Sequence, residues 1–213
     1  MIELVYMKIR KNGTTRHQAA ISEDFLNKYT NLLSNAFISD PLYTHSIPKE
    51  EFRIKKLAGL FKSTLNYGLL FGRINIIPGK GIAVWLSPGE QKITMGRAFQ
   101  AGMFTTPFIV GFTEIINIAN YSTIAERMHH RLAPDPHWYL FLLGVDPLCQ
   151  GLGYGGKLIK PILELADQQK IPCYLDTCNP AAINFYKKHG FVVKDEVKTP
   201  ISGFYYWGLR REV

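Results

Sequence analysis

Apolar residues recur at helical period in several segments of the chain, and a helix is predicted for each of them. In the first segment Ser22 is the expected N-cap, and the apolar face continues from Phe25 to Ala36. In the second, Pro48 stands at the first helical position, where proline is tolerated. The predicted helices lie at residues 22–37, 48–65, 91–101 and 114–130.

Short runs rich in β-branched and aromatic residues predict strands. Residues 72–77 and 81–86 flank the turn Pro78-Gly79-Lys80, which predicts an antiparallel hairpin. The other predicted strands lie at residues 2–9, 138–145, 172–176, 191–197 and 204–209. Together these elements predict an α/β (α+β) fold, in which one mixed, twisted central sheet carries helices on both faces.

Residues 138–191 carry the strongest functional pattern in the chain. A strand ending at Val145 leads into a glycine-rich turn at residues 150–156 and then into an amphipathic helix. The next strand ends at Asp176, and a final helix begins at Asn179. A glycine-rich turn at the start of a helix presents backbone amides at the positive end of the helix dipole, where phosphates bind. The unit therefore predicts a site for a phosphorylated ligand.

The same glycines also fit the dinucleotide-binding pattern G-x-G-x-x-G, which runs here from Gly151 to Gly156. That pattern puts its first glycine directly after the strand, but residues 146–150 intervene here. Too few residues follow Asp176 for the remaining strands of a dinucleotide fold. A Gly-Lys-Ser/Thr phosphate loop is also absent from the sequence. Both nucleotide-binding alternatives are therefore rejected.

A different motif fits this turn better. Gln150-x-x-Gly153-x-Gly155 follows the apolar strand, and residues 179–191 add an Asn, an Ala and a Tyr before Gly-Phe. In these two motifs the chain resembles the GNAT superfamily of acetyl-CoA-dependent N-acetyltransferases. The stretches PHWYLFLLGVDP and CYLDT are similar to the branch of that family that contains puromycin N-acetyltransferase.

The resemblance implies a GNAT-type sheet, in which the strand at 138–145 bulges and splays away from its parallel neighbour. Gly144 is the expected bulge site. The resemblance also implies that acetyl-CoA is the acyl donor, with its pyrophosphate on the loop amides and its pantetheine arm along the strand. The implied cofactor-binding residues are Leu143, Val145, Gln150, Gly151, Leu152, Gly153, Gly155, Gly156 and Asn179.

Two residues are the expected catalytic groups. Tyr186 resembles the family tyrosine that protonates the departing CoA thiolate. Asp176, at the tip of the strand beside the splay, can orient the acceptor ammonium or relay a proton through water. His137 precedes the key strand, but Leu142 already lies about 17 Å along an extended chain from it. A pocket or structural role is therefore expected for His137, and ordered water remains an alternative base. Asn179 also fits a helix N-cap.

Composition limits the other possibilities. The chain of 213 residues carries a formal net charge of +8 without a concentrated basic run, so nucleic-acid binding is not expected. Its three cysteines lack zinc-site spacing, and no metal is expected. The sequence has no signal peptide and no apolar run of membrane-spanning length, which predicts a cytoplasmic protein without a membrane partner.

The predicted activity is direct transfer of an acetyl group from acetyl-CoA to a primary amine. The expected organisation is a single domain, in which residues 1–137 shape the acceptor site and residues 138–213 bind acyl-CoA. Either a monomer or a homodimer fits the sequence. A non-catalytic acyl-CoA-binding module of the same fold is the main alternative, and the tyrosine at position 186 argues against it.

Overall fold

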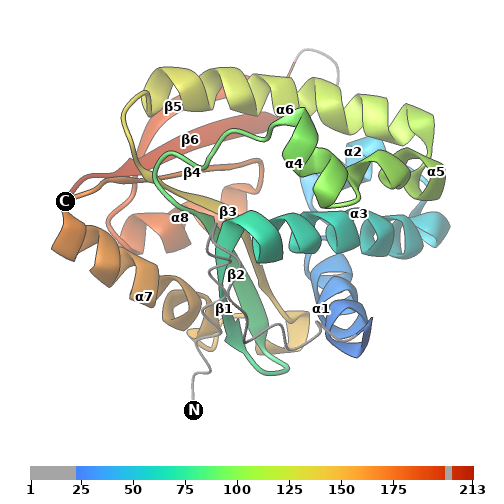
Figure 1. Ribbon diagram of the computed structural model, residues 1–213, viewed down its shortest axis with the longest axis horizontal. Helices are drawn as coiled ribbons and strands as arrows, with labels where there is room; N and C mark the ends of the chain where they lie inside the picture. The colour runs from blue at the N-terminus through green and yellow to red at the C-terminus, as the bar shows by residue number, and fades with distance from the viewer. Residues whose placement is uncertain (1–22, 200–202) are drawn as a thin grey trace.

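The computed structural model describes residues 23–199 and 203–213, and a mixed sheet lies at its centre (Figure 1). In these residues the strand order is β1-β2-β3-β4-β6-β5, and only the β3–β4 pair is parallel. The strands are β1 Gly72–Ile77, β2 Gly81–Leu86, β3 Trp138–Val145, β4 Cys173–Thr177, β5 Val192–Lys198 and β6 Tyr205–Arg211. The predicted α/β class with a mixed sheet is confirmed.

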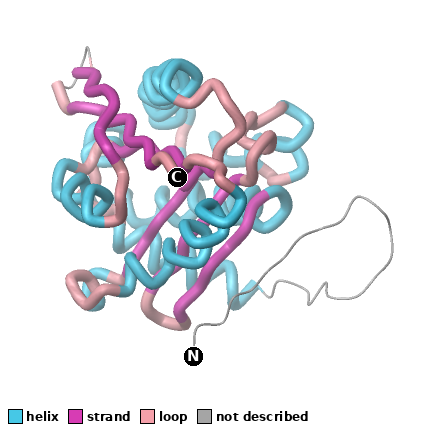
Figure 2. The backbone as a smooth tube through the Cα atoms, turned by 90° about the vertical axis from the view of Figure 1, so that its left-hand side faces the viewer, coloured by secondary structure: helices cyan, strands magenta, loops and turns pink. Residues whose placement is uncertain are grey.

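Helices cover both faces of this sheet, as Figure 2 shows in a second view. One face packs against α7 and α8, and the other packs against α1 and α3 at one end and α6 at the other. The α-helices are α1 Glu23–Ala36, α2 Pro41–Ser46, α3 Glu50–Phe71, α4 Met95–Gln100, α5 Thr106–Val110, α6 Phe112–Leu132, α7 Tyr154–Gln169 and α8 Pro180–Lys188, and short 3-10 turns are η1 Met103–Thr105 and η2 Pro147–Cys149. Each face therefore has its own apolar core.

The sheet opens between β3 and β4. The two strands pair only at their first residues, Trp138 with Cys173 and Tyr139 with Tyr174. Beyond Tyr139 the backbone of β3 is paired on one side, with β2, and has no partner in β4. The splay predicted from the family resemblance is thus present, and it leaves a gap through the sheet at its centre.

The bulge in β3 lies at Phe141, so its prediction at Gly144 is wrong. Val84 pairs with Leu142 while the next residue, Trp85, pairs with Leu140, which leaves Phe141 as the extra residue. The side chains before and after the bulge therefore point to different faces: Leu140 packs on the α7 side, and Leu142 packs with α1 and α3. Gly144 is needed for another reason, because a Cβ there would lie 2.4 Å from Leu33 Cδ2.

Other element predictions differ in detail from the structure. The hairpin at 72–86 and the closing pair of strands are confirmed. The helix predicted at 91–101 is shorter, at Met95–Gln100, and the one predicted from Pro48 begins at Glu50. Helix α2 was not predicted; Asp40 caps it, accepting a hydrogen bond from the Leu42 amide at 3.0 Å. The predicted strand at 2–9 and the Ser22 cap lie outside the described residues.

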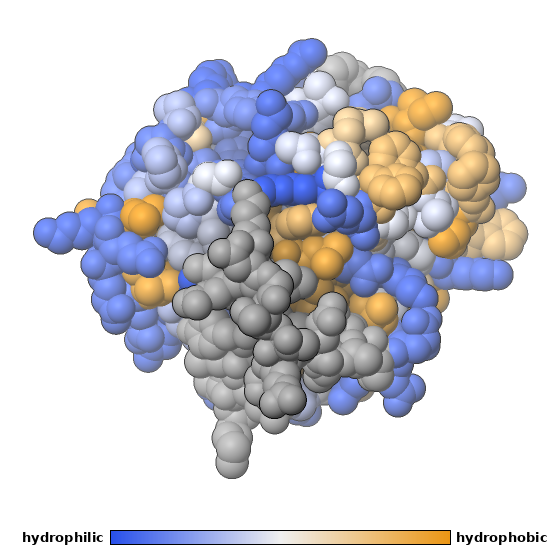
Figure 3. All heavy atoms as spheres, viewed as in Figure 1, coloured by the Kyte–Doolittle hydropathy of each residue, from blue (hydrophilic) through white to orange (hydrophobic). Residues whose placement is uncertain are grey.

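Exposed apolar side chains gather over α4, α5 and the start of α6 (Figure 3). Phe108 is 79% exposed and Phe99 is 73% exposed, and Met95, Phe112 and Ile116 are exposed nearby along the chain. Scattered apolar residues are normal on a protein surface, whereas such a concentration is unusual. A large cleft opens where β3 and β4 separate, and none of these five side chains lines that cleft. The apolar surface is therefore separate from it.

Candidate active site

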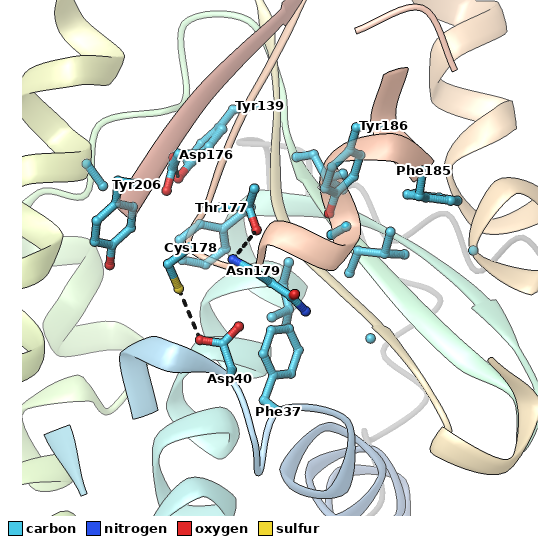
Figure 4. A pocket seen from close by; sticks show the side chains of 18 of the residues that line it. Phe37, Asp40, Tyr139, Asp176, Thr177, Cys178, Asn179, Phe185, Tyr186 and Tyr206 are labelled. Carbon is cyan, nitrogen blue, oxygen red and sulfur yellow. Dashed lines mark hydrogen bonds between the residues drawn. The ribbon is translucent and has the colours of Figure 1, made fainter. Parts of the chain in front are cut away.

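A large cleft passes through the region where β3 and β4 separate. Its volume is about 1540 Å³, and its walls come from both halves of the chain. The loop at residues 149–156 and helix α8 line one end, and α2, α6 and Tyr206 of β6 line the other. Figure 4 shows side chains from both ends directed into this space. The cleft therefore joins the two faces of the sheet through the gap in its centre.

The glycine-rich loop forms the start of α7 at one end of this cleft. After β3 the chain makes the 3-10 turn η2, which accounts for the residues between the strand and the first glycine. Gly151 and Gly153 then adopt φ of 77° and 79°, a left-handed conformation that favours glycine. Helix α7 begins at Tyr154 without a side-chain cap, so its first amides stay open toward the cleft. This arrangement suits an anion such as a pyrophosphate.

The predicted cofactor residues occupy different positions around the loop. Leu143 and Val145 line the cleft from the unpaired side of β3, as do Gln150, Gly151, Gly153, Gly155 and Gly156 from the loop. The side chain of Gln150 turns back and donates to the Val145 carbonyl at 3.2 Å, so it also holds the loop against the strand. Leu152 lies outside the cleft lining and is 64% exposed. Only its backbone is placed to contribute to the loop.

Two lysines near the loop were not singled out from the sequence. Lys157 Nζ lies 5.2 Å and Lys80 Nζ lies 6.0 Å from the ring centre of Tyr154. Lys80 lies in the β1–β2 turn. Its backbone carbonyl accepts a hydrogen bond from the Asp146 amide at 2.9 Å. The hairpin thus brings a second positive charge to the loop end of the cleft, through a contact between distant segments.

Replacing Gly153 by alanine is expected to weaken binding of CoA. No atom lies within 4 Å of the added Cβ, so the methyl group would occupy the open space over the loop where a ligand must approach. The positive φ adds about 1–2 kcal/mol of strain. Calorimetric titration with CoA measures the affinity. Gly102→Ala is the matched control, because Gly102 also has positive φ (75°) and open surroundings but does not line the cleft. An equal loss of affinity in both variants would contradict the prediction.

Asp176 stands at the end of β4, beside the splay. Its Oδ2 accepts a hydrogen bond from the Tyr139 hydroxyl of β3 at 2.8 Å. Burial raises the pKa of Asp176 to about 6, and the hydrogen bond from Tyr139 opposes this rise. A carboxyl group with such a pKa is ionised at neutral pH and is still basic enough to accept a proton.

Tyr186 lies on α8, across the cleft from Asp176, and is 9% exposed (Figure 4). Burial, followed by the charges of Asp176 and Asp40, raises its pKa, so the phenol keeps its proton. Asn179 begins the same helix, and its Oδ1 accepts from the Ala181 amide at 3.0 Å. The N-cap predicted for Asn179 is therefore confirmed. Both residues line the cleft, with Asn179 at the mouth of the gap between the strands.

His137, the other base considered from the sequence, also lines the cleft, beside α6. His137 is buried, and its Nε2 lies 2.6 Å from Nε2 of His129 on α6. Its Nδ1 donates to the Asp135 carbonyl at 2.6 Å, which makes Nε2 the acceptor in this pair. Glu114 forms an ion pair with Lys56 and does not line the cleft, whereas Glu126 lines its outer part.

The histidine pair is expected to make the protein less stable as the pH falls from 7 to 5. Burial, with the neighbouring histidines, lowers the pKa of His129 to about 3, and burial also lowers that of His137. The unfolded chain binds protons at these residues near pH 6.5 and the folded chain does not. The stability that these lowered pKa values contribute is therefore present above this pH and is lost as the pH falls below it, by about 1.4 kcal/mol per pH unit for His129.

Urea denaturation at several pH values measures this effect as a difference between variants. The comparison is needed because the raised pKa of Asp176 contributes the opposite slope between about pH 4 and 6. His129→Gln is expected to lose part of the acid destabilisation. His45→Gln is the control, because His45 is exposed and its ring contacts Phe204, away from the histidine pair. An unchanged slope in His129→Gln would refute the assignment.

A buried polar contact at the α2–α6 end of the cleft was not predicted from the sequence. The Cys178 thiol, just after β4, donates to Asp40 Oδ1 at 3.1 Å. Burial raises the pKa of Asp40. Burial also raises the pKa of Cys178, and the negative charge of Asp40 raises it further. The thiol therefore stays protonated, which removes the basis for a nucleophilic cysteine here.

Comparison with known proteins supports the family suggested by the motifs. Residues 98–191 match the model of the acetyltransferase (GNAT) family. An uncharacterized N-acetyltransferase of Schizosaccharomyces pombe is 27% identical over 176 residues, which cover 78% of this chain and 70% of the relative. These similarities define the protein as an acetyltransferase. The resemblance to the GNAT family that the motifs suggested is confirmed over residues 98–191.

Solved structures support the fold. The chain superposes on a structure from Corynebacterium glutamicum described as histone acetyltransferase HPA2 and related acetyltransferase, with a TM-score of 0.60, 20% identity and coverage of 90% and 92% of the two chains. Arylalkylamine N-acetyltransferase 2 from Aedes aegypti gives a TM-score of 0.53, 16% identity and coverage of 90% and 96%. At these identities the likeness is one of fold alone. The finer similarity to the puromycin N-acetyltransferase branch stays a prediction.

Across residues 23–199 and 203–213, no group of three or more histidine, cysteine or acidic side chains is arranged to hold a metal ion. In the same part of the chain, every helix is too short or too polar to cross a bilayer.

Proposed function

We propose that this acetyltransferase uses acetyl-CoA to acetylate an amine. The observation that carries the proposal is the position of the cleft, which links the open amides of the loop to Asp176 and Tyr186 through the gap between β3 and β4. The loop fits the donor, because its uncapped amides and Lys157 suit phosphates. The free edge of β3 at Leu143 and Val145 suits the amide groups of a pantetheine arm.

The two ends of the cleft have different roles in this proposal. The donor supplies an activated acetyl thioester when it binds at the α7–α8 end. The acceptor amine enters from the α2–α6 end, where Asp176 orients it and accepts its proton, directly or through water. Tyr139 holds the Asp176 carboxylate in place with its hydroxyl. The amine then attacks the thioester directly, and no enzyme nucleophile is required.

Tyr186 is assigned to the leaving sulfur. Its protonated phenol lies at the α8 wall of the cleft and donates a hydrogen bond toward the position at which the thiolate forms. A thiol has an ordinary pKa near 8.5, well below that of a buried phenol. Tyr186 therefore acts mainly by stabilising the thiolate with a hydrogen bond, and solvent can complete its protonation.

An amine screen tests this function. The purified protein is mixed with acetyl-CoA and a panel of amines, and release of the free thiol is followed. Turnover of at least one amine is expected. Tight binding of CoA without turnover of any amine would instead favour the second function considered, a non-catalytic acyl-CoA-binding module.

A further inference from the structure

The acceptor end of the cleft carries two carboxylates in a chain that is otherwise basic. The formal net charge of the whole chain is +8, yet Asp40 and Asp176 both line this part of the cleft. Asp40 lies at the N-cap of α2, and Asp176 lies at the end of β4. Among the salt bridges of the described residues, none joins a lysine or arginine to either carboxylate.

Each of these carboxylates has one oxygen that the protein leaves without a hydrogen bond. Asp40 Oδ1 accepts from both the Leu42 amide and the Cys178 thiol, which leaves Oδ2 without a partner among the described residues. Asp176 Oδ2 accepts a hydrogen bond from the Tyr139 hydroxyl, and Asp176 Oδ1 has no partner among the described residues. Asp40 is only 9% exposed and lines the cleft, and its Oδ2 is not among the buried atoms that lack a partner, so a donor in the cleft can reach this oxygen.

A tyrosine stands close to both acids. Tyr206 is 3% exposed and lines the cleft, and its hydroxyl makes no hydrogen bond within the described part of the chain. Its pKa is raised first by burial and then by Cys178, Asp176, Tyr43 and Asp40. Figure 4 shows Tyr206, Asp176 and Cys178 around the same space, with Asp40 beside Cys178. At the α2–α6 end of the cleft, two carboxylate oxygens and one phenol hydroxyl are thus without a hydrogen bond among the described residues.

We propose that Asp40 and Tyr206 form a second cation subsite, so that the preferred acceptor is a short-chain diamine. One amine reacts beside Asp176 while the other, as an ammonium ion, binds Asp40 Oδ2 and the Tyr206 hydroxyl. This inference rests on the proposed amine acetyltransferase activity.

The chain itself sets the length of the spacer. Cys178, which contacts Asp40, follows Asp176 by two residues, so their Cα atoms lie at most about 7 Å apart. A few methylene groups therefore separate the two nitrogens. A monoamine of the same length leaves the Asp40 subsite unfilled. A site whose buried polar groups are left unpaired discriminates strongly against such a ligand.

The test compares 1,4-diaminobutane with n-butylamine in the wild-type protein and in Asp40→Asn. Asparagine caps helices as well as aspartate does, so the variant keeps α2 while losing the charge. The wild type is expected to prefer the diamine by about 10-fold or more in kcat/KM. In Asp40→Asn this preference is expected to disappear, because kcat/KM falls more for the diamine than for n-butylamine. Glu126→Gln is the matched control, because Glu126 also lines the cleft but is exposed, and it should keep the preference.

A binding measurement separates the two proposals. Calorimetry of each amine with the CoA-loaded protein reports the subsite even without turnover. Tighter binding of the diamine in the wild type, lost in Asp40→Asn, supports the subsite whether or not either amine is acetylated. If both amines are acetylated with equal kcat/KM and bind equally, the diamine subsite is overturned and the acetyltransferase activity stands. If Asp40→Asn has a lower melting temperature and the diamine preference persists, Asp40 is only a helix cap.

Discussion

Replacing Asp176 by asparagine is expected to lower kcat/KM for amine acetylation by about 100-fold or more. Asparagine fills the same space at the end of β4 and can still accept the Tyr139 hydrogen bond, so the fold should be preserved. What it loses is the capacity to accept a proton from the acceptor. The steady-state rate with a substrate found in the amine screen measures the change. A variant as active as the wild type would leave water or another group as the base.

The pH profile gives a sharper test of the same assignment. Asp176 acts as a base only when ionised, so kcat/KM is expected to fall as the pH drops through about 6. Deprotonation of the amine itself adds a second rise at higher pH. Asp176→Asn should lose the lower limb and keep the upper one. Asp167→Asn is the control, because Asp167 pairs with Arg211 outside the cleft.

Tyr139→Phe adds an independent prediction for this limb. The hydroxyl of Tyr139 stabilises the ionised form of Asp176, so its removal is expected to raise the pKa of the carboxyl further. The lower limb of the pH profile should then move to higher pH while the plateau is largely kept. A limb that stays in place would mean that another group titrates there.

Local sequence signals were sufficient for the donor end of the site. The spacing of Gln150, Gly153 and Gly155 after an apolar strand predicted the loop, and Asn179-Pro180 predicted the start of α8. These features depend on residues that are neighbours in the chain, where backbone preferences and capping act directly. The hairpin at 72–86 was predictable for the same reason.

The acceptor end depends on contacts between distant segments, which no local pattern encodes. Asp40 meets Cys178 only because α2 packs beside the end of β4, and a six-residue helix gives little periodic signal. The bulge at Phe141 is set by the register of β2 against β3, whereas a lone glycine suggested Gly144. Likewise, His137 contacts His129 at the end of α6, and the seven residues between them give no local signal for this contact.

Replacing Tyr186 by phenylalanine is expected to lower kcat by about 100-fold while leaving the affinity for CoA nearly unchanged. The ring packs with Phe185 and Phe191, and phenylalanine keeps those contacts, so the loss isolates the hydroxyl. Because Tyr186 lies on α8 and the phosphate-binding amides lie on the loop before α7, the two measurements should separate. Single-turnover kinetics measure the rate, and calorimetric titration with CoA measures the affinity.

Tyr205→Phe is the control, since Tyr205 lies outside the cleft on β6 and should not change the rate. An unchanged kcat in Tyr186→Phe would remove the proposed role and assign protonation of the thiolate to solvent alone, whereas a parallel loss of CoA affinity would show that Tyr186 shapes the donor site instead.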